Sequence, residues 1–469
     1  MVTFAIALIA LVLGYVFYGK FIERLFGADP NREVPSKSMA DGVDYIAMPT
    51  WKAYMIQFLN IAGLGPIFGA IMGAKFGTAS YLWIVFGTIF AGSVHDYLSG
   101  MISLRNGGES LPQLVGRYLG SNIQKVFMVF SMILLVLVGA VFVSQPADIL
   151  VRLTGESMSI NTWIAIIFIY YLLATLFPID KIIGRLYPIF GGALLFMALG
   201  IMAALFVNHP QLPEMWNGFG TKYDNNPIFP MMFISIACGA ISGFHATQSP
   251  LMARCITNES RGRLVFYGAM ISEGIVALIW AAAATAYFGE HGTDSTAAQI
   301  VLDISKTWLG KVGGLLAVIG VVAAPISSGD TALRSARLIV ADFLKKKQKT
   351  IGSRLAISIP LFVITFFALF YSLRDKEGFN VIWRYFAWSN QALSVFTLWA
   401  VTVYLETKRK NVLVTLIPAM FMSMVTCTYI LIAKEGLQLP WYIAYAGGAL
   451  FTISLLVIFL MWRRKQRAQ

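Results

Sequence analysis

Charged residues are scarce in this chain, and that scarcity excludes most soluble folds. Only 13% of its 469 residues are charged, whereas 58% are hydrophobic; soluble domains carry about twice that share of charge. The three cysteines, Cys238, Cys255 and Cys427, form no CxxC pair, and no HExxH motif or comparable metal cluster occurs. We therefore expect a membrane protein that is not an enzyme and holds no cofactor or structural metal.

The hydrophobic residues fall into long runs. Thirteen stretches approach the roughly 20 residues needed to cross a bilayer, which predicts an all-α polytopic membrane protein. Residues 3–22 have no positively charged side chain before Lys20 and no small-x-small cleavage site, so we expect a retained first span rather than a signal peptide. The stretches are 3–22, 51–74, 79–102, 122–145, 160–178, 184–207, 229–253, 264–289, 312–343, 354–373, 380–405, 411–433 and 441–462.

The net charge of +13 follows the predicted topology. With the N-terminus outside, about three quarters of the 36 lysines and arginines fall in the cytoplasmic segments, which is the positive-inside pattern. We therefore interpret the basic charge as topological and expect no nucleic-acid partner. The prediction is a multi-pass protein with the N-terminus outside and the C-terminus in the cytoplasm.

Two of the predicted spans are interrupted near their middle. One contains Gly63-Leu64-Gly65-Pro66, and the other contains Gly239, Ser242, Gly243 and Pro250. Glycine permits positive φ, and proline removes an N–H donor. Lipid offers backbone groups no hydrogen-bond partner, so broken helices persist only against protein or a water-filled cavity. Paired breaks at corresponding places in two halves indicate a transporter binding site. A row of small residues through Gly69 and Gly73 could equally form a packing face.

The breaks lie in the second and seventh spans. Five spans separate their starts, so the second block of five enters the membrane from the opposite face, as in the leucine-transporter-like 5+5 inverted repeat. This fold class is also that of the amino acid–polyamine–organocation superfamily. The domain organisation that we expect is 1–50 for the first helix and its connection, 51–207 for the first repeat, 208–228 for an external loop, 229–405 for the second repeat, and 406–469 for two C-terminal helices and a basic tail.

A broken helix exposes N–H groups at one half-helix and carbonyls at the other. The N–H ends can bind a substrate carboxylate, and the carbonyl ends can hold a cation. His245 is either an interhelical hydrogen-bond partner or a substrate- or proton-binding group. Asn390 and Gln391 either join helices or face the transport path. The predicted substrate-binding residues are Gly63, Leu64, Gly65, Pro66, Gly239, Ser242, Gly243, His245, Gln248 and Asn390.

Carboxylates within spans are costly and usually functional. Asp330 is the principal coupling candidate, with hydroxyls of Ser327, Ser328 and Thr331 as further oxygen donors, and Asp96 and Glu273 are auxiliary candidates. A protonatable carboxylate would serve H⁺ coupling, whereas an ionised one would serve Na⁺ at Ser327 and Ser328. Alternatively, Asp330 and Arg334 form an i,i+4 ion pair that is only structural.

Six stretches together resemble the carbon starvation protein A family over about residues 38–400. They are Asp41-Gly42-Val43-Asp44-Tyr45 leading to Pro49-Thr50, then Ile61 to Pro66, Asp96 with Ser103-Leu104-Arg105, Phe244 to Gln248, Asp330-Thr331-Ala332 through Arg334 to Arg337, and Ser389-Asn390-Gln391. The resemblance implies a bacterial inner-membrane carrier that takes up pyruvate by proton symport, or peptides. This chain is shorter than better-known members and has Ile56-Gln57 where many place histidines, and Ala70 where many repeat proline.

The sequence thus predicts a secondary active transporter that works by alternating access in the lipid bilayer. We expect import of a small carboxylate nutrient, with pyruvate preferred, by cation-coupled symport, the cation being H⁺ before Na⁺. The alternative is uptake of di- or tripeptides. A channel would need a continuous polar stripe along several spans, and a sensor would need an output domain; neither occurs in the sequence. The oligomeric state is not predicted.

Overall fold

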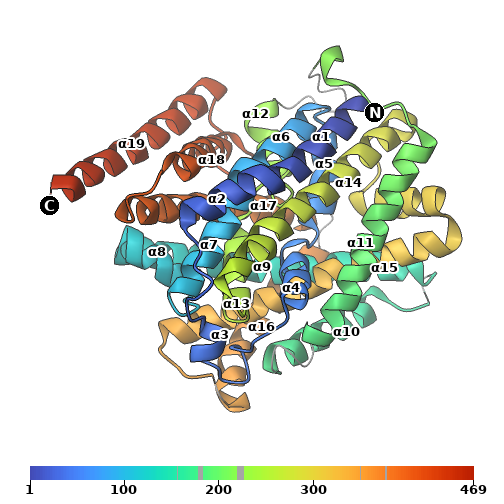
Figure 1. The fold of residues 1–469 in the computed structure, drawn as a ribbon. Coiled ribbons are helices and arrows are strands. Elements are labelled where there is room, and N and C mark those ends of the chain that lie inside the picture. The colour runs from blue at the N-terminus through green and yellow to red at the C-terminus, as the bar shows by residue number, and fades with distance from the viewer. Residues whose placement is uncertain (156, 178–182, 219–226, 349, 375–377, 469) are drawn as a thin grey trace.

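The computed structural model describes residues 1–155, 157–177, 183–218, 227–348, 350–374 and 378–468, and their regular structure is helical (Figure 1). Its α-helices are α1 (Val2–Leu13), α2 (Gly19–Phe26), α3 (Pro35–Ser38), α4 (Thr50–Ile61), α5 (Ala70–Ala74), α6 (Ala79–Phe86), α7 (Ser93–Arg105), α8 (Leu111–Leu119), α9 (Ser121–Leu153), α10 (Ile160–Leu176), α11 (Ile183–Asn208), α12 (Ile228–Ser235), α13 (Gly243–Ala253), α14 (Ala269–His291), α15 (Ala297–Phe343), α16 (Ile351–Arg374), α17 (Gly378–Thr407), α18 (Leu413–Ile432) and α19 (Trp441–Ala468). Tighter or wider turns join several of them at η1 (Gly14–Tyr18), η2 (Gly65–Gly69), η3 (Gly87–Gly92), η4 (Met215–Asn217), η5 (Glu259–Arg261) and η6 (Arg263–Gly268).

Each of the thirteen stretches expected to span the membrane lies on helix. Among the described residues, eight helices are long and apolar enough to cross a membrane, and α4 with η2 and α5 adds a ninth, bent by 55°. The expected spans at 79–102, 160–178, 229–253 and 380–405 correspond to α6–η3–α7, α10, the separate helices α12 and α13, and α17. The polytopic helical class is confirmed, whereas the count of thirteen and the sidedness stay predictions.

The helices pack into one bundle around a buried centre. Helix α9 contacts α15, α16 and α17, while α14 contacts α1, α4, α5 and α6. In Figure 1, α11 and α15 lie on the opposite side from α18 and α19, and α19 carries the C-terminus outward. The half-helices α4 and α13 lie at the centre and contact one another.

Helix α15 is two helices joined at a kink. Gly310 has φ of 68°, a conformation that favours glycine, and interrupts the helical path. The part before it has apolar residues at helical spacing, and the Thr296 side chain caps it by accepting a hydrogen bond from the Gln299 N–H (3.3 Å). The part after Gly310 is the ninth expected span, which passes the centre of the bundle.

Candidate functional site

The second span breaks after Ile61. Ala62 leaves helical geometry with φ −79° and ψ 55°, and the chain resumes at η2, where Pro66 occupies the first turn. Proline lacks an N–H and is tolerated only near such a start. The expected break at Gly63-Leu64-Gly65-Pro66 is therefore confirmed.

The glycines at this break have a different role from the one expected. Neither Gly63 nor Gly65 has positive φ, so the expectation of left-handed backbone there is wrong. A Cβ on Gly63 would lie 2.5 Å from the Phe142 ring, and one on Gly65 would lie 2.1 Å from Cys238 Cβ. These residues are glycine because neighbouring segments approach too closely for any side chain.

The seventh span breaks between α12 and α13, and its gap packs against the first break. Along the small-residue row, a Cβ on Gly69 would lie 2.9 Å from the Ser235 carbonyl, and one on Gly73 would lie 2.1 Å from Ile236. The row is thus a packing face, as the alternative interpretation held, but the surface it contacts is the other broken span. The two breaks meet inside protein, and their residues are buried.

Two side-chain amides of α17 form hydrogen bonds with polar groups at the break in the seventh span. Asn390 Oδ1 accepts hydrogen bonds from Ser242 Oγ (2.8 Å) and from the Phe244 N–H at the start of α13 (2.7 Å). Gln391 Nε2 donates to the Ile241 carbonyl (3.1 Å). The structure therefore brings Asn390 to the predicted site as a group that supports the break. Gln248 lies one turn further along α13, where Ser335 Oγ donates to its Oε1 (3.4 Å).

Helix α15 is joined to the first break by a side chain. Ser328 Oγ donates a hydrogen bond to the Leu59 carbonyl (2.7 Å), close to the end of α4. The hydroxyls of Ser327 and Thr331 instead bond carbonyls of their own helix. The ninth expected span therefore passes this break.

Asp330 is buried two residues further along α15. Tyr187 of α11 donates a hydrogen bond to its Oδ1, and the same hydroxyl lies 2.5 Å from the Ser327 carbonyl. Its Oδ2 has no hydrogen-bond partner among the described residues. The alternative pairing of Asp330 with Arg334 is wrong, because that guanidinium binds Asp44 (2.9 Å) and the carbonyls of Ala174 and Phe177.

The other predicted ionisable groups form a second buried cluster. His245 Nδ1 lies 2.9 Å from Asp96 Oδ2, and its Nε2 lies 3.3 Å from Glu273 Oε2. His95 Nδ1 lies 2.8 Å from the other oxygen of Asp96. All four side chains are fully buried. They come from the third, seventh and eighth expected spans, so the imidazole of His245 links three spans.

The charge of this cluster suits a proton site. His245 Nδ1 lies within hydrogen-bond distance of Asp96, whereas His245 Nε2 and both oxygens of Glu273 have no hydrogen-bond partner among the described residues. With His245 charged and His95 neutral, the cluster carries one negative charge, and a proton added at Glu273 makes it neutral. Since an uncompensated charge is costly away from water, the cluster can take up and release a proton within the bundle.

Sequence reasoning missed two amides on α4. Gln57 and Asn60 are fully buried, and neither the nitrogen nor the oxygen of either amide has a hydrogen-bond partner among the described residues. They lie three residues apart and so share a helix face. The sequence offered a signal for both, because they are polar residues in a predicted span shortly before its break, and Gln57 stands where many family members have histidine.

The surroundings of α4 show where these amides point. Tyr54 pairs with Ser272 of α14 (2.6 Å), and Met55 packs against Gly191 of α11. Helix α4 also contacts α13, α15 and η6. Gln57 lies three residues after Tyr54 and therefore close to the same side of the helix, and Asn60 lies three residues further on. Both amides are enclosed by these neighbouring segments.

Asp44 forms ion pairs near the expected cytoplasmic end of α15. Its carboxylate lies 2.9 Å from Arg334 Nη1 and 3.7 Å from Arg337 Nη2. Burial alone raises the pKa of Asp44, but the guanidinium groups of Arg334, Arg337 and Arg254 outweigh it and hold the pKa below its usual value. The segment preceding α4 is thereby tied to α15.

Comparisons with known proteins agree with this architecture. The solved structure of MhsT in complex with L-phenylalanine matches with TM-score 0.57 and 14% identity, covering 87% of this chain and 97% of that one. A manganese transporter of Eremococcus coleocola, in complex with an aromatic bis-isothiourea substituted compound, matches with TM-score 0.56 and 12% identity, covering 91% and 99%. Both have the leucine-transporter fold, so the predicted fold class is confirmed.

Relatives by sequence extend over most of the chain. An uncharacterized membrane protein of Haemophilus influenzae is 43% identical over 339 residues, which cover 61% of this chain and 91% of the relative. The peptide transporter CstA of Campylobacter jejuni is 24% identical, covering 88% and 77%, and that of Bacillus subtilis is 25% identical, covering 89% and 88%.

The family assignment rests on a match along the chain. The family model described as "Carbon starvation protein CstA" matches residues 1–160, 151–307 and 296–429. That match confirms the resemblance seen in the sequence and assigns the chain to transporters rather than enzymes. This multi-pass membrane protein belongs to the carbon starvation protein CstA family of secondary transporters.

Proposed function

We propose that this protein is a proton-coupled importer of short peptides, working by alternating access in the bacterial inner membrane. The sequence alone favoured pyruvate. Two lines of support now favour peptides: curated relatives bear the name peptide transporter CstA, and the unpartnered amides at the first break suit a peptide better than a keto acid.

The amides carry the proposal. Gln57 and Asn60 together present two NH₂ groups, which donate, and two carbonyl oxygens, which accept. Pyruvate at neutral pH offers acceptors only, so it would leave both buried carbonyl oxygens without a donor. A di- or tripeptide offers N–H donors and carbonyl acceptors together and can satisfy both kinds of atom. An unpaired buried polar group costs about 1–3 kcal/mol, which favours the peptide.

The remaining groups have complementary roles in the proposal. The breaks at Gly63 to Pro66 and Gly239 to His245 frame the substrate, and N–H groups in the first turn of α13, apart from that of Phe244, which donates to Asn390, hold its carboxylate. Asp330 binds the coupling proton, because its Oδ2 is buried and open to protonation while Tyr187 holds Oδ1. The cluster of Asp96, His245 and Glu273 is an auxiliary proton store.

Uptake into proteoliposomes tests the proposal. Labelled dialanine or labelled pyruvate is offered under an imposed inward proton gradient, and separately under an inward sodium gradient with no pH difference. We expect dialanine to accumulate with the proton gradient only, and excess pyruvate not to compete. Accumulation of pyruvate without dialanine uptake would show that the substrate is not a peptide. Accumulation with the sodium gradient alone would show that the coupling ion is Na⁺, with Ser327 and Ser328 as its ligands.

A further inference from the structure

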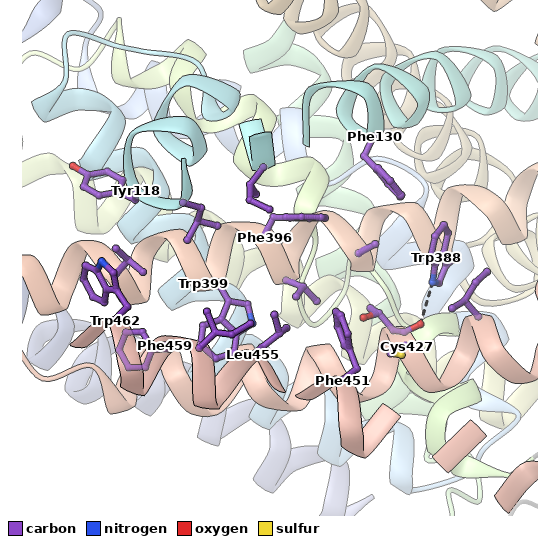
Figure 2. Close-up of a pocket in the computed structure, with 18 residues that line it drawn as sticks. Tyr118, Phe130, Trp388, Phe396, Trp399, Cys427, Phe451, Leu455, Phe459 and Trp462 are labelled. Atoms are coloured by element: carbon purple, nitrogen blue, oxygen red, sulfur yellow. Dashed lines mark hydrogen bonds between the residues drawn. The ribbon is translucent and has the colours of Figure 1, made fainter. Parts of the chain in front are cut away.

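An apolar pocket lies far from the buried polar centre, at the side of the bundle that carries α19. Its volume is about 560 Å³, and Figure 2 shows side chains of α17 and α19 facing one another across it. Helices α8, α9 and α18 complete its walls. The lining residues used below are Tyr118, Ile123, Trp388, Trp399, Phe451 and Trp462.

The pocket opens on the periphery of the bundle. Ile458, Phe451 and Ile123 keep 62%, 42% and 37% of their surface exposed, whereas Trp399 and Phe459 are buried at its floor. Helix α19 is the outermost helix in Figure 1. In a membrane protein, exposed apolar side chains at this position face acyl chains. The pocket is therefore accessible from the lipid phase.

The polar atoms of the pocket are already satisfied. Trp388 Nε1 donates to the Thr426 carbonyl (3.1 Å), and Trp399 Nε1 donates to Ser423 Oγ (3.1 Å). The Thr426 hydroxyl donates to Met422 within its own helix. No group there requires a polar partner, so the cavity suits a hydrocarbon chain rather than a peptide or an ion.

One end of the pocket is bordered by basic residues. Figure 2 places Tyr118 and Trp462 at this end and Trp388 at the other. Arg463 follows Trp462 directly and pairs with Glu406 (3.0 Å). Arg464 and Lys465 come next, are exposed, and form no ion pair within the part of the chain that the structure describes. Lys465, three residues after Trp462, lies on the side of α19 that lines the pocket, whereas Arg464 lies on the opposite side. One free cation therefore lies just beyond the apolar lining.

We propose that this pocket binds an anionic phospholipid. One acyl chain fills the space between α17 and α19, and Lys465 binds the headgroup phosphate. A zwitterionic lipid fills the same space but gains less from this cation, because a lysine near a membrane surface attracts negative headgroups. The indole of Trp462 lies at the junction, where aromatic residues usually meet the interface.

The test uses the full chain purified in detergent and native mass spectrometry with equal amounts of phosphatidylglycerol and phosphatidylcholine. We expect the wild-type chain to retain phosphatidylglycerol preferentially. Lys465→Gln should reduce that preference by roughly fivefold, while Arg464→Gln, which removes the neighbouring charge from the opposite side of α19, should leave it unchanged.

A second variant tests the apolar part. Ala392 lines the pocket, and Ala392→Phe should displace both lipids without changing the oligomeric state. Equal retention of the two lipids by the wild-type chain would overturn the proposal, as would a dimer that buries the pocket with no lipid bound. If Ala392→Phe does not fold, the charge variants alone decide. Substrate identity does not enter this test, so its outcome is separate from that of the transport assay.

Discussion

Ser328 donates a hydrogen bond to the carbonyl of Leu59 (2.7 Å), and this contact joins the ninth expected span to the end of the first half-helix. The two residues are 269 positions apart in sequence. Asp330 lies two residues further along α15, and Gln57 lies two residues before Leu59 on α4. We propose that this bond couples protonation of Asp330 to the first break.

Removing the connection should uncouple transport. Ser328→Ala leaves the buried Leu59 carbonyl unpaired, at a cost of about 1–3 kcal/mol. We expect lower thermal stability and a larger loss of gradient-driven dipeptide accumulation than of exchange. Ser305→Ala is the matched control, because the buried hydroxyl of Ser305 makes no hydrogen bond in the described structure. Equal effects of the two variants would contradict the account.

Asp330 should be required for accumulation but not for exchange. Asp330→Asn keeps an oxygen that accepts from Tyr187 but cannot lose or gain a proton at neutral pH. In proteoliposomes we expect no accumulation of dipeptide under a proton gradient, with exchange of internal for external dipeptide partly retained. Asp303→Asn, in the amphipathic part of α15, is the control. Unchanged accumulation in Asp330→Asn would show that another group, such as the His245 cluster, binds the coupling proton.

His245 should be energetically coupled to both of its acidic neighbours. His245→Leu leaves Asp96 and Glu273 without their shared imidazole, and breaking a buried pair costs about 3–5 kcal/mol. Adding Glu273→Gln removes one of the stranded charges and should restore part of the stability. A double-mutant cycle on thermal unfolding measures this, with exposed His291→Leu as control. Additive effects would exclude the coupling.

Gln57 and Asn60 should lower the stability of the protein and strengthen dipeptide binding. Gln57→Leu and Asn60→Leu each remove unpaired buried polar atoms, so we expect an unchanged or higher melting temperature together with weaker dipeptide uptake. Gln391→Leu provides the contrast, since its amide donates to Ile241 and its loss should lower stability. Should the Gln57 and Asn60 variants melt earlier, the amides would have partners within the fold, and the substrate argument would fail.

The stability that the ion pair of Asp44 and Arg334 contributes should be lost at low pH. Because the folded-state pKa of Asp44 lies below its usual value, its contribution to stability is complete above the unfolded pKa of about 3.9 and is lost as pH falls through the lower folded pKa. Asp44→Asn should abolish this acid dependence and leave two buried guanidinium groups without their carboxylate. Thermal unfolding between pH 3 and pH 7 measures it, with Asp41→Asn as control; parallel curves for wild type and Asp44→Asn would contradict it.

Local sequence signals predicted the helices and both breaks. Apolar runs define membrane helices, and Gly65-Pro66 marks a break wherever it occurs, because backbone chemistry acts at short range. The i,i+4 spacing of Asp330 and Arg334 gave a wrong alternative, since Arg334 binds Asp44, 290 residues away. Tyr187, the actual partner of Asp330, and the orphan amides Gln57 and Asn60 depend on tertiary packing, which spacing does not encode.

The position of the substrate between the two broken spans is most directly tested at Cys238, which lies at their contact and takes a hydrogen bond from Asn390 (3.2 Å). In a chain with Cys255→Ala and Cys427→Ala, the rate of alkylation by a membrane-permeant maleimide is measured at increasing dipeptide concentration. We predict that alkylation slows in proportion to site occupancy, while pyruvate has no effect. An unchanged rate at a dipeptide concentration that saturates transport would contradict the account.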